Sequence, residues 1–579
     1  MTRSALLVTL PLLLALPALA ADKFVPVAAW SGRLILPSLD ERRDDGGVFF
    51  EVENAPDDAS ALQGQRLWLR YEDAPALDER VRRLRVDVAF NKAVLQHMAK
   101  GAVHPERING WRQVSPLESL AGARPLDDVT VFLVEPHLDR AKGELRIRQD
   151  PVQTTGTHKA LVRFIRRTAQ GFIVQHYDRS RRSFYNGVEE EILHTLRPAP
   201  TTSSAPLTSL DGIEGTAQNE AGYFVYGRHT PQGFLLEALA PRGLLCGAES
   251  FRVEAPRARE YLRHENLTNV EQKKGTSWSA RMLGHARRDK TSSAWSEGTR
   301  GLVVHTFGGV GGPRGMETFV PGIETGHFSF GSVTRVREPL SDELCMEVIY
   351  RQVYAHNHEG IISGASSWET YAGSVTRGWM YLRPLSDLLI DLPLVTTTFS
   401  VGGRKVDPLG VLLEELDVMA ARYRTGDGTG GAIVTPSSSC VQDSTQALFV
   451  ALQRFEDRLL RDPSIARLPK NDPGRLRLAQ LQRVLTSVEA RLLPLGGLRT
   501  DWRHAASLSV TKRTEPVSPL LGALRTLLTM RTMLPRFVHD ELGDYALQEG
   551  AEIVILRTNQ IGGVVDGVFP TAPQSLTHR

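Results

Sequence analysis

The chain has 579 residues, of which 41% are hydrophobic and 23% charged, and this composition excludes a wholly disordered or collagen-like polymer. The 69 Lys and Arg residues nearly balance the 66 Asp and Glu residues, and a formal net charge of +3 argues against a dedicated nucleic-acid-binding protein. At roughly 100–200 residues per domain, a chain of this length is expected to form about three domains.

The first twenty residues have the features of a secretory signal peptide. Arg3 supplies a positive charge, an apolar run follows from Ala5 to Leu16, and Ala18-Leu19-Ala20 is a small-residue cleavage site. We expect residues 1–20 to be removed, although an uncleaved anchor is the alternative. No later stretch reaches the roughly 18 consecutive apolar residues of a membrane helix. The sequence therefore predicts a periplasmic or secreted protein whose mature chain has no transmembrane span.

Three cysteines, Cys246, Cys345 and Cys440, follow the predicted signal peptide. An exported protein can form disulfides, but an odd number leaves at least one thiol unpaired within the chain. A Cys246–Cys345 bridge with Cys440 free is one of three pairings, and the sequence does not choose among them.

Residues 21–197 are predicted to form a β-rich domain, with a barrel or sandwich as its architecture. Short runs of alternating or apolar residues are separated by turn-forming residues, as strands are in all-β domains. The expected strands are Arg33–Pro37, Gly47–Val52, Arg66–Tyr71, Arg85–Phe90, Val129–Val134 and Ala160–Ile165, with a helix near Asn91–Lys100.

A Pro-, Ser- and Thr-rich segment at residues 198–206 is predicted to be a linker. It precedes a mixed α+β domain over residues 207–455, which ends in helical periodicity. The expected elements there are strands at Gly222–Gly227, Phe234–Ala240, Gly301–Thr306, His327–Val336, Glu347–Tyr354 and Met380–Pro384 and a helix at Leu409–Arg424.

Residues 456–579 are predicted to form a helical domain. The stripe formed by Leu478, Leu481, Leu485, Val488 and Leu492 has near-heptad spacing and is interpreted as a core-facing surface. Ser518-Pro519 is a typical helix start before a further leucine-rich run. The fold class expected overall is a multidomain α+β protein.

Cys440 is the candidate nucleophile. A proline and a serine run precede it, and an amphipathic helix is expected to begin just after it. The free N–H groups and dipole of a helix N-terminus stabilise a thiolate, so this position predicts a lowered thiol pKa. Gln442 and the backbone of Ser437–Ser439 are candidate oxyanion donors. The structural alternative is a buried or disulfide-bonded cysteine beside an ordinary helix cap.

Several histidines are candidates for the base that a nucleophilic cysteine needs. His327 begins a strand after a glycine-rich loop, His356 and His358 end the next strand, and His305 ends an earlier one next to glycines. Each histidine taken alone is also compatible with a structural role.

The order of these residues resembles that of the circularly permuted papain-like hydrolases and acyltransferases. In that family a histidine on an early strand serves a cysteine at a helix start, and a polar residue on the next strand orients the imidazole. The resemblance implies that Cys440 is the nucleophile, His327 the base, and His356 or Asn357 the orienting residue.

A second resemblance covers most of the chain. The segments 301–312, 326–340, 354–364, 422–432, 440–448 and 554–563 resemble exported bacterial and cyanobacterial proteins labelled predicted Abi (CAAX) family protease. Proteases of that class carry a Glu-Glu-x-x-x-Arg motif on membrane helices. Here Glu414-Glu415 is followed by Met419 at the arginine position. The chain therefore departs from the motif on which the named mechanism depends.

Two further patterns concern metal and phosphate binding. His356 and His358 alternate along an expected strand and could share one zinc ion, but a third ligand is not identifiable. Gly426–Gly431 lacks the Lys-Ser/Thr pair of a phosphate-binding loop and is interpreted as a flexible loop before Cys440. No cofactor is expected.

These patterns predict an exported hydrolase that cleaves a peptide, amide or ester bond of a cell-envelope substrate by cysteine chemistry. The alternatives are a non-catalytic envelope-binding protein and a metal-dependent hydrolase. Nucleic acid is not an expected partner, and the sequence does not indicate an oligomeric state.

Overall fold

The computed structural model describes residues 23–84, 114–124, 127–194, 209–284, 295–313, 326–353, 362–376, 378–425, 440–455, 462–492, 534–562 and 567–573. It is a mixed α/β structure, with about 30% of its residues in helices and 36% in strands. The coarse prediction of a mixed, sheet-rich fold is thus confirmed.

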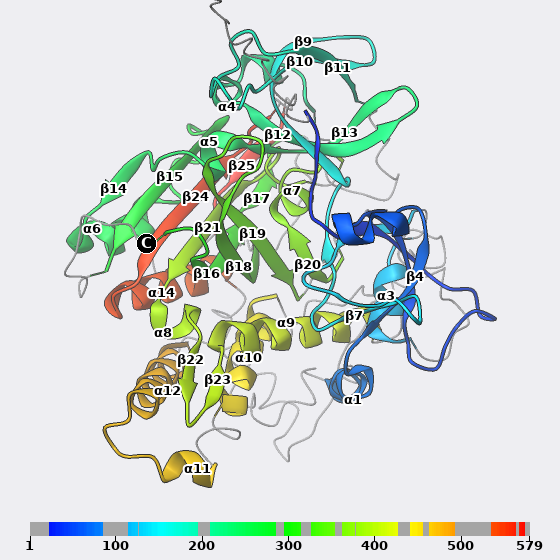
Figure 1. Ribbon diagram of the computed structural model, residues 1–579. Coiled ribbons are helices and arrows are strands. Elements are labelled where there is room, and N and C mark those ends of the chain that lie inside the picture. Colours follow the sequence, from blue (N-terminus) through cyan, green and yellow to red (C-terminus); the bar gives the residue numbers. More distant parts are fainter. Residues whose placement is uncertain are drawn as a thin grey trace, which may run out of the picture.

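A fifteen-stranded mixed sheet runs through the described part of the chain (Figure 1). In spatial order its strands are β14 (Phe251–Val253), β15 (Thr276–Leu283), β24 (Glu552–Asn559), β21 (Pro384–Asp391), β16 (Arg300–Phe307), β18 (His327–Arg337), β19 (Leu344–Gln352), β20 (Gly364–Ser367), β8 (Val152–Gln153), β5 (Val129–Phe132), β2 (Ser31–Ile35), β3 (Val48–Asn54), β4 (Arg66–Tyr71), β7 (Glu144–Ile147) and β6 (His137–Asp139).

The centre of this sheet is covered on both faces. Every residue of β21 and β24 is buried, as expected of near-continuous apolar strands enclosed on two sides. One core includes Val303, Tyr350 and Tyr371, and a second includes Val304, Phe328 and Cys440. Alternate residues of β16 therefore point into different cores, which makes these strands the wall between them.

A smaller sheet of six strands contains a closed barrel (Figure 1, upper part). Because β12 pairs with both β13 and β9, the circuit β9-β10-β11-β13-β12 closes on itself. The strands are β1 (Val25–Pro26), β9 (His158–Arg167), β10 (Gly171–His176), β11 (Glu189–Leu193), β12 (Tyr223–Thr230) and β13 (Gly233–Pro241). The barrel thus combines strands from both sides of the predicted linker, whose residues 198–206 lie outside the described ones.

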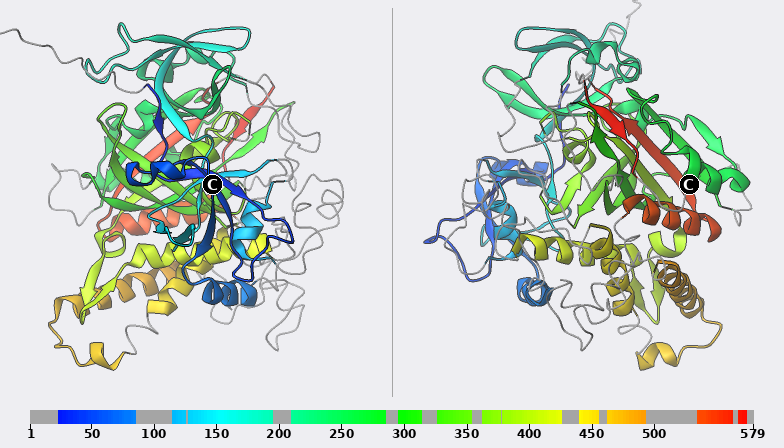
Figure 2. Two further views of the ribbon diagram at one scale, coloured as in Figure 1. Left: turned by 45° about the vertical axis from the view of Figure 1, so that its right-hand side comes forward. Right: turned by 180° about the vertical axis from the view of Figure 1, so that it is seen from behind.

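Four longer helices gather on one side of the large sheet (Figures 1 and 2). They are α9 (Pro408–Thr425), α10 (Cys440–Phe455), α12 (Pro473–Leu492) and α14 (Pro535–Gln548). The five-residue stripe predicted to face a core on α12 is buried, which confirms that interpretation.

The remaining described elements are short. The helices are α1 (Ala74–Leu84), α3 (Pro116–Ala121), α4 (Ala217–Ala221), α5 (Arg242–Leu245), α6 (Ala255–Glu260), α7 (Trp368–Tyr371), α8 (Pro393–Thr396) and α11 (Pro463–Ala466), with helical turns η1 (Asp57–Leu62), η4 (Ile213–Gly215) and η5 (Tyr261–Glu265). Two-stranded ladders join β17 (Gly309–Gly311) to β25 (Phe569–Thr571) and β22 (Phe399–Val401) to β23 (Arg404–Val406).

A purely helical C-terminal region is not what the structure has. Strand β24 lies between β15 and β21 and pairs antiparallel with each along all eight of its residues. Its run Glu552–Asn559 is apolar and β-branched at its centre, which favours a buried strand, and it completes the middle of the sheet. The C-terminal segment is therefore part of the same sheet as β16 and β18.

Most predicted strands of the described segments are present within a few residues of the expected bounds. The exception is the run Met380–Pro384, because residues 380–383 form a turn and β21 begins only at Pro384. The predicted strand at Arg85–Phe90 and the helices near Asn91–Lys100 and after Ser518 lie outside the described residues.

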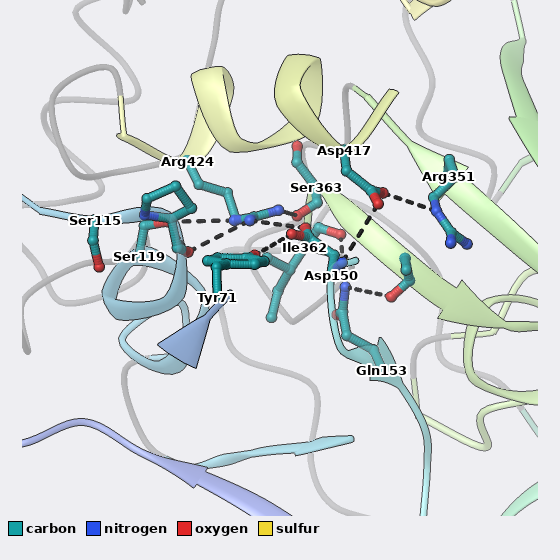
Figure 3. A network of polar contacts seen from close by, with 12 residues as sticks. Tyr71, Ser115, Ser119, Asp150, Gln153, Arg351, Ile362, Ser363, Asp417 and Arg424 are labelled. Atoms are coloured by element: carbon teal, nitrogen blue, oxygen red, sulfur yellow. Dashed lines mark hydrogen bonds and ion pairs between the residues drawn. The ribbon is translucent and has the colours of Figure 1, made fainter. Parts of the chain in front are cut away.

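A buried ionic network joins α9 to the N-terminal part of the sheet (Figure 3). Arg424 donates to Asp150 at 3.0 Å and to the carbonyl of Ser363 at 2.6 Å, and the hydroxyl of Tyr71 donates to the same aspartate. Arg424 has no exposed side-chain surface and Asp150 has 2%. Because buried charges are costly unless paired, this network fixes α9 against strands that are distant in sequence.

The disulfide is the Cys246–Cys345 bridge, with an S–S length of 2.03 Å, and Cys440 is free. The bridge links the end of α5 to β19. Of the three pairings compatible with the sequence, this one leaves the candidate nucleophile as a thiol.

Candidate active site around Cys440

Cys440 is the first residue of α10, as its sequence context predicts. The residue is buried, with 8% of its surface exposed. The position matches the prediction of a cysteine opening an amphipathic helix, with Val441, Leu448 and Phe449 on the buried side.

The predicted lowering of the thiol pKa is wrong. Burial raises the pKa of Cys440 to about 12, and the carboxylate of Asp443 acts in the same direction. Backbone N–H groups of Phe328, Val441 and Cys440 itself oppose the shift, but they do not offset the loss of water around the sulfur. The helix N-terminus contributes as expected, and desolvation outweighs it.

The sulfur of Cys440 lies at the edge of β18. The backbone N–H of Phe328, the residue after His327, is near enough to the sulfur to lower the pKa of the thiol, and Phe328 and Cys440 belong to the same core. Backbone N–H groups lie in the plane of a sheet, and pairing between β18 and β19 begins only at Phe330 and Arg351. The thiol therefore takes a position next to the start of the strand that carries the predicted base.

His327 is held by a residue on the neighbouring strand. Its Nε2 lies 2.7 Å from Oε1 of Gln352, which is the last residue of β19. The ring also stacks on Phe307, with centroids 5.2 Å apart. Burial lowers the pKa of His327 to about 4 despite the hydrogen bond to Gln352. The imidazole is therefore neutral at physiological pH.

A second histidine stands on the same face of the sheet. Nδ1 of His305 lies 2.6 Å from Oδ1 of Asp387, and its Nε2 lies 3.2 Å from the hydroxyl of Tyr371. Tyr350 donates its hydroxyl to Oδ2 of the same aspartate at 2.8 Å. Burial raises the pKa of both tyrosines well above the usual range, with Asp387 contributing in each case.

The two histidine groups are connected. Nε2 of Gln352 donates to Oγ of Ser329 at 3.4 Å, and the ring centroid of His327 lies 6.3 Å from that of Tyr371 and 6.5 Å from that of His305. The charge of a Cys440 thiolate also raises the pKa of Tyr371, so the sulfur and this hydroxyl are electrostatic neighbours. His305, His327, Gln352 and Tyr371 therefore form one buried polar cluster beside the thiol.

The first turn of α10 is anchored to the end of α9. Asp443 pairs with Arg422 at 3.0 Å and accepts a hydrogen bond from the hydroxyl of Tyr423. All three side chains are almost fully buried. This contact fixes the helix start, and with it the position of the sulfur.

Several predicted site residues cannot be placed. His356 and Asn357, the predicted orienting residues, lie outside the described residues, as do Ser437–Ser439 and the glycine-rich loop at 426–431. Gln442 belongs to α10, but its side chain is outside the described part. The residue that does contact the imidazole of His327 is Gln352.

Sequence reasoning missed Gln352 and Asp387. Asp387 had a usable signal, because a carboxylate in the middle of the buried run Pro384–Asp391 is rarely tolerated without a partner. Gln352 had none, since its role depends on which residue of β19 ends beside His327.

The metal and CAAX-type hypotheses find little support in the described residues. Within them, no group of three or more His, Cys, Asp or Glu side chains could hold a metal ion, while His356 and His358 lie outside them. Glu415 forms ion pairs with Arg80 and Arg454, which fasten α9 to α1 and α10. Among the described helices, none is both long enough and apolar enough to cross a membrane.

No protein-family model, curated protein or solved structure matches the chain.

Proposed function

We propose that the protein is an exported thiol hydrolase that cleaves a peptide, amide or ester bond, with Cys440 as nucleophile and His327 as base. The observation that carries the proposal is the placement of Cys440 at the start of α10, in one core with Phe328, the residue after a histidine whose ring is oriented by Gln352. Nucleophilic cysteine chemistry requires a thiol and an oriented imidazole within hydrogen-bond reach of each other when substrate is bound.

The reaction would begin from a neutral pair. Burial raises the pKa of the thiol to about 12 and lowers the pKa of the imidazole to about 4. In the free enzyme the proton therefore stays on the sulfur. The proton would move to His327 as the sulfur attacks the carbonyl carbon, as it does for a serine hydroxyl, whose pKa is also high.

The remaining steps follow from this transfer. The tetrahedral oxyanion would be stabilised by N–H groups at the start of α10. His327 would return its proton to the leaving amine or alcohol as the carbon–heteroatom bond breaks, leaving a thioester on Cys440. Water, deprotonated by the same imidazole, would then release the acid and restore the thiol.

A panel of p-nitrophenyl esters and peptide aminomethylcoumarins tests the proposal. Turnover should be abolished by Cys440→Ala, and a thioester adduct should be detectable by intact mass in the wild-type protein. A panel that is cleaved equally well by Cys440→Ala would overturn it. The absence of both turnover and adduct would instead favour a non-catalytic envelope-binding protein, for which the burial of Cys440 is the supporting observation.

A further inference from the structure

Residues 23–27, which follow the predicted signal peptide, lie along an edge of the small barrel. Strand β10 pairs with β9 from Val162 onward, and β12 takes the opposite edge of β9. The segment fills the remainder of the first edge, where Val25 and Pro26 of β1 pair with Lys159 and His158. A strand of two residues is held only weakly by its backbone, so its side-chain contacts decide whether it stays in place.

The side chain of Phe24 packs against histidine rings at the end of the barrel. Its ring centroid lies 5.2 Å from that of His176, 4.9 Å from that of His229 and 4.4 Å from that of Phe234. The ring of His158 lies 5.2 Å from that of His229. Burial lowers the pKa of both His158 and His176 below 6.5, so these two rings are neutral at pH 7.

Lys23 and His176 share one carboxylate oxygen. Oε2 of Glu190 on β11 lies 3.1 Å from Nζ of Lys23 and 3.1 Å from Nε2 of His176. While the ring is neutral, Lys23 is the cation that pairs with this oxygen. A protonated His176 would bring a second cation to the same oxygen. Burial lowers the pKa of His176, and the charge of Lys23 acts in the same direction.

The bound segment also leaves the second nitrogen of His176 without an acceptor. Nδ1 of this ring is buried, and no described residue is hydrogen-bonded to it. An imidazolium carries a hydrogen on both nitrogens, and a buried N–H without an acceptor is costly. Departure of Phe24, which packs on the ring, would admit water to it, while Glu190 belongs to the barrel and would remain beside Nε2.

The other charged groups near the two rings do not reverse this balance. Glu190 favours the charged form of His176, but burial outweighs it. His229 disfavours the charged form of His158, as burial does. Glu53 of β3 accepts from the hydroxyl of Thr157 at 2.8 Å, and that hydroxyl lies 3.3 Å from Nδ1 of His158. The bound segment therefore disfavours protons on both rings.

We propose that residues 23–27 form a latch that acid releases, in which protonated His176 replaces Lys23 as the partner of Glu190 and Phe24 leaves the barrel. Binding of the segment lowers the pKa of His158 and His176, so release is coupled to proton uptake. The latch is therefore held most firmly above pH 6.5, the ordinary histidine pKa, and weakens as the pH falls below it. This latch is independent of the chemistry proposed for Cys440.

Hydrogen–deuterium exchange of the purified protein, read by mass spectrometry, follows the latch directly. After correction for intrinsic exchange, peptides that contain residues 23–27 should lose about tenfold or more of their protection between pH 7 and pH 5. Peptides from β9 and β10 should keep theirs, because the barrel stays folded. Equal protection of residues 23–27 at both pH values, or an equal loss over the whole barrel, would overturn the inference.

His176→Gln removes the proposed proton acceptor and keeps a donor for Glu190. Because glutamine is not protonated in this range, the segment should keep most of its protection at pH 5. His264→Gln is the matched control, since His264 is an exposed histidine of η5 that lies 3.9 Å from Glu260, away from the barrel. This control should lose protection as wild type does. A loss in His176→Gln as large as in wild type would refute the role of His176.

Lys23→Gln gives a second test without changing a buried residue of the barrel, should His176→Gln not fold. It removes the cation that competes with His176 for Glu190. The segment should be less protected at pH 7 than in wild type, and it should lose less protection on acidification. A pH dependence identical to that of wild type would show that Lys23 and His176 do not exchange on Glu190.

Discussion

Nε2 of His327 and Oε1 of Gln352 lie 2.7 Å apart, and they come from the facing ends of two neighbouring strands. This contact turns Nε2 of the imidazole toward β19 and fixes the orientation of the ring. The interpretation of the site as catalytic gives Gln352 the task of orienting the base.

Gln352→Leu should therefore slow acylation of Cys440 by about tenfold or more, because the ring of His327 loses its fixed orientation. Gln352→Glu should instead raise the pKa of His327, since a carboxylate favours the imidazolium. Rates from intact mass and histidine titration by NMR measure the two effects. Gln175→Leu, a change to a half-buried glutamine in the barrel, is the control. Equal rates in Gln352→Leu and wild type would contradict the assigned role.

Acid should destabilise the protein through His327. Burial lowers the pKa of this group from 6.5 to about 4, so its folded form resists protonation more than its unfolded form does. Its contribution to the free energy of unfolding is fully present above pH 6.5 and is lost as the pH falls toward 4.

Urea unfolding of wild type and His327→Gln at pH 7 and at pH 4 isolates this contribution. Because the ring is partly exposed, the wild type should lose about 2 kcal/mol more than the variant over this interval. A wild type that loses no more stability than His327→Gln between pH 7 and pH 4 would contradict the lowered pKa of this imidazole.

The disulfide should stabilise the fold without affecting the site. Cys246 and Cys345 are 99 residues apart in sequence, and the bridge restricts the unfolded chain. The double variant Cys246→Ser/Cys345→Ser should lower the free energy of unfolding by about 2–4 kcal/mol while Cys440 reacts at the wild-type rate. Thiol titration of the denatured, unreduced wild type should find one thiol per chain. Two or more thiols would show that the bridge does not form.

Arg424 should be important for stability. Arg424→Met leaves Asp150 buried without its cation, which should cost about 3–5 kcal/mol. The double variant Arg424→Met/Asp150→Asn should recover part of the loss, because it removes the uncompensated charge. Urea titration checks both. A single variant as stable as wild type would mean that the network in Figure 3 contributes nothing to stability.

The hydrophobic pattern of a single segment predicted its helix or strand well where that pattern alone decides which side chains are buried. The run Arg66–Tyr71 is strand β4 with the expected bounds, and the stripe on α12 faces a core. Long-range pairing could not be read in this way. Strand β24 lies between β21, about 170 residues away in sequence, and β15, about 270 residues away. The hydrophobic periodicity of one segment does not indicate which distant strand it pairs with.

Some features of the candidate site were likewise predictable from the sequence, and others were not. Cys440 at a helix start and His327 at a strand start followed from neighbouring residues. The pKa of the thiol did not, because it depends on how much water the two cores exclude, and that is a property of the packed structure. Gln352 and Asp387 gain their roles only through the register of β19 and β21.

Single-turnover acylation of Cys440 by p-nitrophenyl acetate at pH 7 tests the central claim most directly. Wild type, His327→Gln and His176→Gln would be compared, the last replacing a buried histidine of the barrel. We expect His327→Gln to be slower by about 100-fold or more and His176→Gln to match wild type. Equal acylation rates in wild type and His327→Gln would contradict the pairing of His327 with Cys440.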